Sequence, residues 1–309
     1  MRALGRCLAG VALALAAVLA EAGVRAVDDS GRSVALAAPA QRIVSLAPHA
    51  TELLFALGAG GRVVGASAAS DWPAAARSVP RVGDARAIDL ERIVALNPDL
   101  VVTWPYTAPE AVDRLRRRGI PVFVLDAKSI DALPSQFARL GQLVGEASRN
   151  GAALAAERAA LLDALRARHR DAAPITVFYQ IWNAPLYTVG GTHLISQAIA
   201  LCGGRNVFAA ESLPAPAVGV EAVLAARPQA IIAGTDGAKR PSWLDDWRRW
   251  PMIPAVAAGE LHAVDADLLH RPGPRFVDGV AALCATIDGV RTRAAQASTV
   301  VAPGTQARR

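Results

Sequence analysis

The segment Leu90-Glu-Arg-Ile-Val-Ala-Leu-Asn-Pro-Asp-Leu-Val-Val102 joins a short helical pattern to a short apolar strand. We expect the helix to stop at Asn97, because a proline disfavours helical backbone in the residue before it. The same combination recurs 130 residues later as Val220-Glu-Ala-Val-Leu-Ala-Ala-Arg-Pro-Gln-Ala-Ile-Ile232, with Glu, Ala and Pro at matching places. The chain therefore contains an internal repeat, with one copy in each half.

Strands and helices alternate around the first copy. The expected elements are the strands Arg42–Leu46, Arg62–Gly65, Leu100–Trp104 and Pro121–Leu125, and the helices Thr51–Leu57, Leu90–Leu96 and Ala111–Arg118. This alternation is typical of a mostly parallel sheet flanked by helices. Together with the repeat, it predicts an α/β protein of two similar lobes with central, mostly parallel sheets.

The stretch Ser129–Arg170 separates the two halves. It is rich in Ala, Leu, Arg and Glu, and its apolar residues recur at helical spacing. We expect one long helix, or two abutting helices with an interruption at Asn150-Gly151. The predicted organisation is a signal peptide at 1–26, an N-terminal lobe at 27–128, a connecting helix at 129–171, a C-terminal lobe at 172–293 and a flexible tail at 294–309.

Two lobes joined by a stiff helix form a cleft, and clefts between lobes are favoured ligand sites. In open α/β sheets, ligands lie outside the carboxyl ends of the strands. This directs attention to the loops after Leu46, Gly65, Trp104, Ile181 and Val264.

Composition excludes several classes of protein. Of 309 residues, 53% are hydrophobic and 19% are charged, so the chain has too much apolar material for a disordered protein. The net charge of +6 is spread without a run of five basic residues, which argues against a nucleic-acid partner. The nucleophile-elbow, phosphate-loop and H-E-x-x-H motifs are absent, and adjacent carboxylates such as Asp28-Asp29 rarely converge on one substrate atom. We expect no enzyme activity, no catalytic residues, no cofactor and no resident metal.

The first residues resemble a secretory signal. Arg2 and Arg6 precede the uncharged stretch Leu8–Ala20, which is too short to cross a bilayer. Ala20-Glu21-Ala22 is one cleavage site of the A-x-A type and Val24-Arg25-Ala26 is a second; a membrane anchor is the alternative. We expect export to the periplasm of a chain that does not span the inner membrane.

Two cysteines remain after cleavage, Cys202 and Cys284. An oxidising compartment favours a disulfide between them. Two buried thiols are the alternative.

Four segments carry a resemblance to the periplasmic substrate-binding proteins of the cobalamin, haem and siderophore class, and above all to the cobalamin-binding members. They are Arg42–Gly58, Ser70–Pro73, Leu90–Val101 and Cys202–Phe208. The similarity runs from about residue 41 to 287. The family fold is two α/β lobes bridged by a long helix, and the family's disulfide falls on the two cysteines.

The resemblance also implies partners. The family's permease-docking glutamates fall on Glu91 and Glu221, which the internal repeat places at equivalent positions in the two lobes. Such carboxylates pair with arginines of an ABC importer, whose permease dimer works with an ATPase. A first-turn glutamate favoured by the helix dipole is the plainer interpretation. The binding protein is expected to act as a monomer.

A corrinoid is a wide, mostly apolar disc with amide arms, so it needs aromatic walls and a few polar anchors. The resemblance implies contacts from the loop Asp267–Arg271, from Trp72 and from Tyr187. Strand ends add Trp104, Tyr106 and Trp182, whereas family aromatic positions are alanine at 69, 85 and 215. The ligand contacts predicted from sequence are Ala69, Trp72, Tyr187, Asp267, Leu268, Leu269, His270, Arg271, His49, Trp104 and Trp182.

Three histidines, His49, His193 and His270, are candidates for coordinating a ligand's metal. The alternative is a histidine at a helix start that hydrogen-bonds to the backbone. The resemblance predicts a protein that captures cobalamin as transported cargo and delivers it to an ABC importer. The same role for haem or a ferric siderophore is the second hypothesis, and a cleft protein for sensing or adhesion is the third.

Overall fold

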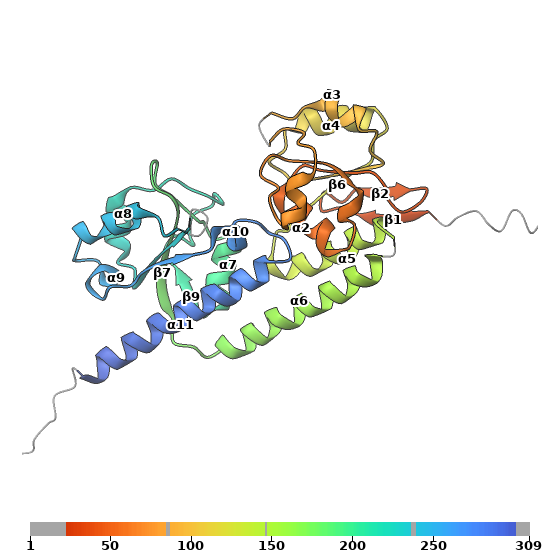
Figure 1. Ribbon diagram of the computed structural model, residues 1–309. Helices are drawn as coiled ribbons and strands as arrows, with labels where there is room; N and C mark the ends of the chain where they lie inside the picture. The colour runs from red at the N-terminus through yellow and green to blue at the C-terminus, as the bar shows by residue number, and fades with distance from the viewer. Residues whose placement is uncertain (1–22, 85–86, 146, 236–238, 301–309) are drawn as a thin grey trace, which may run out of the picture.

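The computed structural model describes residues 23–84, 87–145, 147–235 and 239–300. Two α/β lobes stand side by side, and long helices run along them (Figure 1). This confirms the predicted fold class. Within the described ranges, no helix combines the length and the apolar character that a membrane crossing requires.

The N-terminal lobe contains a four-stranded sheet in the order β4-β3-β5-β6, and all of its pairings are parallel. A small antiparallel hairpin, β1–β2, precedes it. The strands are β1 (Val24–Val27), β2 (Ser33–Leu36), β3 (Ile43–Ser45), β4 (Val63–Ala66), β5 (Leu100–Thr103) and β6 (Val122–Val124). The helices are α2 (Pro48–Ala56), α3 (Leu90–Ala95) and α4 (Pro109–Arg117), with short 3-10 turns at η2 (Gly60–Arg62) and η3 (Ala74–Ser78).

The C-terminal lobe repeats this plan in a sheet of order β11-β10-β7-β8, with β9 also paired to β7. All pairings are parallel except that of β8. The strands are β7 (Ile175–Trp182), β8 (Tyr187–Thr188), β9 (Gly204–Asn206), β10 (Ala230–Gly234) and β11 (Leu261–Val264). The helices are α7 (Leu194–Leu201), α8 (Val220–Ala226), α9 (Pro254–Ala257), α10 (Ala266–Leu269) and α11 (Phe276–Val300), with a 3-10 helix at η5 (Ser242–Arg249).

Successive residues of a strand point to opposite sides of a sheet, and in β5 and β10 all of them are buried, so each sheet is covered on both faces. In the first lobe, Val102 packs towards α2 and α5, whereas Val101 packs towards α3 and α4. In the second lobe, Tyr179 belongs to the core that runs through both lobes, and Phe178 belongs to a separate core under α8 and η5. The outer helices α3 and α4 therefore lie on the side of the first lobe away from α5 and α6 (Figure 1).

The connection between the lobes is two helices, α5 (Leu133–Leu143) and α6 (Ala147–His169), after a 3-10 turn at η4 (Ile130–Ala132). They pack side by side (Figure 1). The predicted break at Asn150-Gly151 is wrong: the chain turns at Gly145, which has a φ of +74°. Gly151 lies within α6, where a Cβ would come within 3.1 Å of the Gly141 Cα atom. It marks a close helix contact, not a helix end.

Two further boundaries differ from the sequence prediction. β1 begins at Val24, inside the segment 1–26 assigned to the signal peptide; residues 1–22 lie outside the described residues, as does Ala85. α11 continues to Val300, so the start of a flexible tail at 294 is corrected, and the rest of the tail lies outside the description. The predicted disulfide is confirmed: Cys202 and Cys284 join the end of α7 to α11, with their Cα atoms 4.7 Å apart.

Candidate functional site

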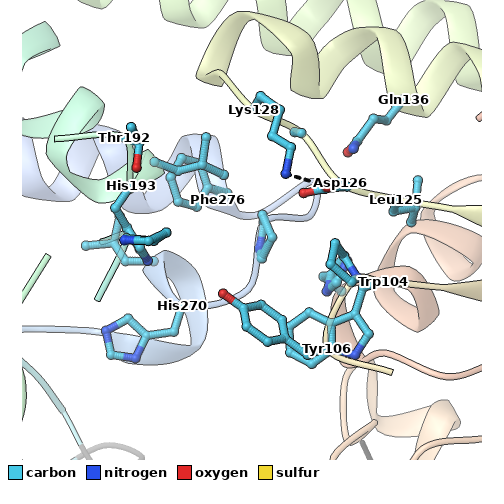
Figure 2. A pocket seen from close by; sticks show the side chains of 17 residues that line it. Trp104, Tyr106, Leu125, Asp126, Lys128, Gln136, Thr192, His193, His270 and Phe276 are labelled. Atoms are coloured by element: carbon cyan, nitrogen blue, oxygen red, sulfur yellow. Dashed lines mark ion pairs between the residues drawn. The ribbon is translucent and has the colours of Figure 1, made fainter. Parts of the chain in front are cut away.

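A cavity of about 620 Å³ lies between the lobes and takes its walls from both (Figure 2). Most of its residues follow the carboxyl ends of strands or begin helices, as expected for an open α/β sheet. The lining residues are His49, Trp104, Pro105, Tyr106, Leu125, Asp126, Ala127, Lys128, Gln136, Thr192, His193, Leu194, Pro214, Leu269, His270, Pro272 and Phe276.

The N-terminal lobe contributes an aromatic wall from the loop after β5. The rings of Trp104 and Tyr106 meet edge to face with centroids 4.8 Å apart, and His49 meets Trp104 in the same way at 5.2 Å. Tyr106 keeps 68% of its surface exposed, and no described residue hydrogen-bonds to the buried Nε1 of Trp104. The wall therefore combines apolar area for a flat ligand with an N–H that has no acceptor among the described residues.

The C-terminal lobe faces this wall with two histidines. His193 begins α7 and its Nδ1 accepts a hydrogen bond from the Ile195 backbone N–H at 3.1 Å. Burial and the nearby His270 lower the pKa of His193 to about 4. His270 lies 3.1 Å from the Tyr179 hydroxyl, and burial also lowers its pKa.

His49, across the cavity, has a pKa lowered to about 4 by burial and by Arg271. The three histidines are therefore neutral at neutral pH. Among the residues described, no group of three or more His, Cys, Asp or Glu side chains is placed to hold a metal ion. The helix-start interpretation applies to His193, whose Nδ1 is occupied by the backbone.

The floor of the cavity follows β6. Lys128 forms an ion pair with Asp126 at 2.6 Å, so the one Lys or Arg among the described lining residues is paired with its own counter-charge (Figure 2). Gln136, from α5, lies beside them. Sequence reasoning did not select this floor, although Asp126 directly follows the predicted strand Pro121–Leu125.

An ion network bridges the lobes next to the cavity; it consists of Glu52, Asp71, Asp267, Arg271 and Arg275. Glu52, on α2, is only 4% exposed and accepts two hydrogen bonds from Arg275, at 2.9 and 2.7 Å, and one from Arg271 at 3.2 Å. Arg271 also contacts Asp71 at 2.6 Å and Asp267 at 2.9 Å. Both arginines come from the loop between α10 and α11, so this loop of one lobe is anchored on the other.

Four of the predicted ligand contacts line the cavity: His49, Trp104, Leu269 and His270. Three more predicted contacts, Trp72, Asp267 and Arg271, lie at the ion network. Arg271 pairs with Asp267, and the guanidinium of Arg275 lies 4.4 Å from the centroid of the Trp72 ring. The structure places Ala69, Leu268, Tyr187 and Trp182 outside the cavity lining; Trp182 is 60% exposed, and its Nε1 donates to the Ala184 carbonyl.

Glu91 and Glu221 are exposed in the first turns of α3 and α8. Residues 90–100 and 220–230 show the same pattern of buried and exposed side chains at every position. Just after the helices α3 and α8, Asn97 and Arg227 adopt the same left-handed backbone, each with a φ of +46°. The sequence repeat is therefore also a structural one, and it presents one glutamate per lobe.

Comparison with known proteins gives a consistent result. A family model described as "Periplasmic binding protein" matches residues 43–268. A vitamin B12-binding protein of Vibrio cholerae is 35% identical over 248 residues, which are 80% of this chain and 88% of that protein. Another, of Pectobacterium carotovorum, is 35% identical over 255 residues, with the same coverage of each chain.

Solved structures agree. The crystal structure of the periplasmic vitamin B12-binding protein of Vibrio cholerae matches with a TM-score of 0.74 at 33% identity, covering 82% of this chain and 98% of that one. A periplasmic heme-binding protein from Roseiflexus sp. RS-1 matches with a TM-score of 0.72 at 27% identity, covering 81% and 99%. The similarity therefore spans both lobes and includes relatives named for two different ligands.

Proposed function

We propose that this chain, which belongs to the periplasmic binding protein family, captures cobalamin between its lobes and delivers it to an ABC importer. Relatives named as vitamin B12-binding proteins, similar over about four-fifths of the chain, support this ligand. The role is binding and delivery, and it needs neither a catalytic step nor a cofactor. Its place is the periplasm, reached through the predicted signal sequence.

The observation that carries the proposal is the charge balance of the cavity. Its histidines are neutral, and Lys128 is already paired with Asp126. Haem and most ferric siderophores bring anionic groups, which need free cations when they leave water. A corrinoid brings uncharged amide arms around an apolar ring, and these match an aromatic wall with neutral polar groups.

The arrangement of His193 also favours a ligand bound through its edges. Its Nδ1 accepts from the Ile195 N–H, so the ring proton of the neutral form lies on Nε2. That nitrogen can donate to an amide oxygen but has no lone pair for a metal. We therefore propose His193 as a hydrogen-bond donor to the ligand's periphery.

We further propose that Glu91 and Glu221 dock the loaded monomer on the two permease subunits, at the membrane surface and without crossing it. Their support is the matching placement in the two lobes, since two symmetry-related subunits offer two equivalent sites. Exposed carboxylates suit a reversible, charge-assisted contact with arginines.

The ligand is tested by calorimetric titration of the mature protein with cyanocobalamin, haem and a ferric siderophore in parallel. We expect tight one-to-one binding of cyanocobalamin and weaker binding of the other two. Preferred binding of haem or of the siderophore would overturn the cobalamin assignment and leave the transport role in place.

Docking is tested separately with the double variant Glu91→Arg/Glu221→Arg in a reconstituted importer. We expect transport to be lost while the affinity for cyanocobalamin is unchanged. The matched control is Glu110→Arg/Glu211→Arg, which changes one other exposed glutamate of each lobe by the same charge. Equal transport by the two double variants would remove the docking role.

A further inference from the structure

The turn between β1 and β2 carries the adjacent carboxylates Asp28 and Asp29, and it lies outside the region matched by the family model. Both residues are bound to β6. The Asp29 N–H donates to the Val124 carbonyl at 3.1 Å, and the Val124 N–H donates to Asp28 Oδ2 at 3.2 Å. The N-terminal hairpin is therefore tied to the strand that leads into the cavity floor.

Asp29 also contacts two residues that line the cavity. The Asp126 N–H donates to Asp29 Oδ2 at 2.6 Å, and Gln136 Nε2 donates to the same oxygen. The guanidinium of Arg139 pairs with the other oxygen, Oδ1. Asp29 thus holds the backbone of one lining residue and the side-chain amide of another.

This contact decides which end of the Gln136 amide is left for a ligand. A carboxylate has only acceptors, so Gln136 must turn its NH₂ group towards Asp29. The remaining polar atom, Gln136 Oε1, receives no hydrogen bond from the described residues, and the side chain lies on the cavity wall (Figure 2). The polar atom that Gln136 leaves for a ligand is therefore an acceptor.

We propose that Asp29 is a specificity-determining positioning residue: it fixes the Gln136 amide so that the cleft accepts an N–H-bearing arm and rejects a carboxylate. The inference rests on the proposed cobalamin function, because a corrinoid's edge carries such amide arms. A ligand carboxylate in the same place would bring its oxygen, which only accepts, against Gln136 Oε1, which also only accepts. Leaving such groups unsatisfied weakens binding by about tenfold or more.

The test compares cyanocobalamin with its three monocarboxylic acids, in each of which one propionamide arm is hydrolysed to a carboxylate. For the wild-type protein, we expect at least one acid to bind at least tenfold more weakly than the amide. In Asp29→Asn, the new NH₂ group is disfavoured against the Arg139 guanidinium, so it takes the place of Oδ2. There it loses the hydrogen bond from the Asp126 N–H and lets the Gln136 amide turn over, so that Oε1 accepts from it. We expect the gap to fall below about threefold in this variant.

Asp28→Asn is the matched control, because Asp28 lies in the same turn and contacts β6, but among the described residues its carboxylate accepts no hydrogen bond from one that lines the cavity. It should keep the wild-type selectivity even where stability falls. Gln136→Met removes the acceptor at similar size and should also lose the selectivity. The double variant Asp29→Asn/Gln136→Met should lose no more than Gln136→Met alone, which distinguishes positioning from general weakening.

The outcomes separate this inference from the proposed function. If the wild-type protein fails to bind cyanocobalamin, the proposed function fails and the inference fails with it. If the wild-type protein binds the amide and all three acids equally, or if Asp29→Asn keeps the selectivity of Asp28→Asn, only the role of Asp29 is refuted. Should Asp29→Asn not fold, Gln136→Met alone decides whether the acceptor exists.

Discussion

Replacing Glu52 with alanine removes the central carboxylate of the interlobe ion network. Its side chain is only 3% exposed, and it accepts three hydrogen bonds from Arg271 and Arg275. Breaking a buried ion pair by removing one partner costs about 3–5 kcal/mol, because a buried charge is left uncompensated. Arg271 retains Asp71 and Asp267, so we expect the lower end, about 3 kcal/mol of lost unfolding free energy.

The loss is measured by urea unfolding at pH 7, followed by circular dichroism. Asp71→Ala is the matched control: it removes another carboxylate that pairs with Arg271, but this one is 48% exposed. An exposed ion pair contributes about 0–1 kcal/mol, so the control should be nearly neutral. The difference between the two variants isolates the effect of burial at one shared arginine.

The ion network also joins the two lobes, so removing Glu52 should change the shape of the cavity between them. Residue Gly273, in the anchored loop, lies close enough to His49 that a Cβ would sit 3.2 Å from the His49 carbonyl oxygen. We expect Glu52→Ala to bind cyanocobalamin more weakly than Asp71→Ala does. The reasoning is refuted if Glu52→Ala unfolds within about 1 kcal/mol of Asp71→Ala.

Three further predictions concern protonation, backbone and processing. Burial lowers the pKa values of His49 and His193 to about 4, so the unfolded chain binds more protons than the folded one between pH 4 and 6.5. The unfolding free energy should therefore fall as the pH drops through that window, by up to about 1.4 kcal/mol per pH unit for each histidine. In urea unfolding, His49→Gln should show a smaller dependence of the unfolding free energy on pH. Arg227→Asn should raise stability by about 0.5–1 kcal/mol in thermal unfolding, since asparagine tolerates left-handed backbone better; an unchanged Tm would contradict this. Intact mass should place the mature N-terminus at Gly23, because the later cleavage site would remove most of the strand Val24–Val27.

The repeat made the fold predictable. Leu90–Val102 and Val220–Ile232 each contain a helix, a proline stop and a buried strand, and the structure has these elements at both places. Such patterns predict local structure correctly because apolar spacing and proline affect the backbone within only a few residues. The class of fold and the two lobes follow from these signals alone.

The sequence did not predict where the connecting helices turn. Gly145 and Gly151 are both glycines in a helical pattern, and only the packing separates their roles. At Gly145 the backbone is left-handed, whereas at Gly151 the lack of a side chain lets helix α5 pack closely. A single sequence does not distinguish a turn glycine from a packing glycine, because the distinction depends on a distant partner.

The cavity was predictable in place but not in full composition. The loops after Leu46, Trp104 and Val264 contribute to it or to the helices that frame it, as strand-end reasoning expected. Asp126 and Gln136 were missed because the hairpin contact that orients them comes from Asp29, about a hundred residues earlier in the chain. Contacts of that range leave no local pattern.

The two lobes are alike at the proposed docking sites and differ at the cavity. This distribution fits the proposed roles of the two surfaces. The outer segments that carry Glu91 and Glu221 keep the same burial pattern and the same left-handed ending. Each lobe supplies one histidine from the start of a helix, His49 or His193, but the aromatic rings of Trp104 and Tyr106 come from the first lobe alone. Two symmetry-related permease subunits need two equivalent contacts, whereas one ligand lacking such symmetry needs two unlike walls. Internal similarity is therefore retained in full where the proposed contact is made twice and only in part where it is made once.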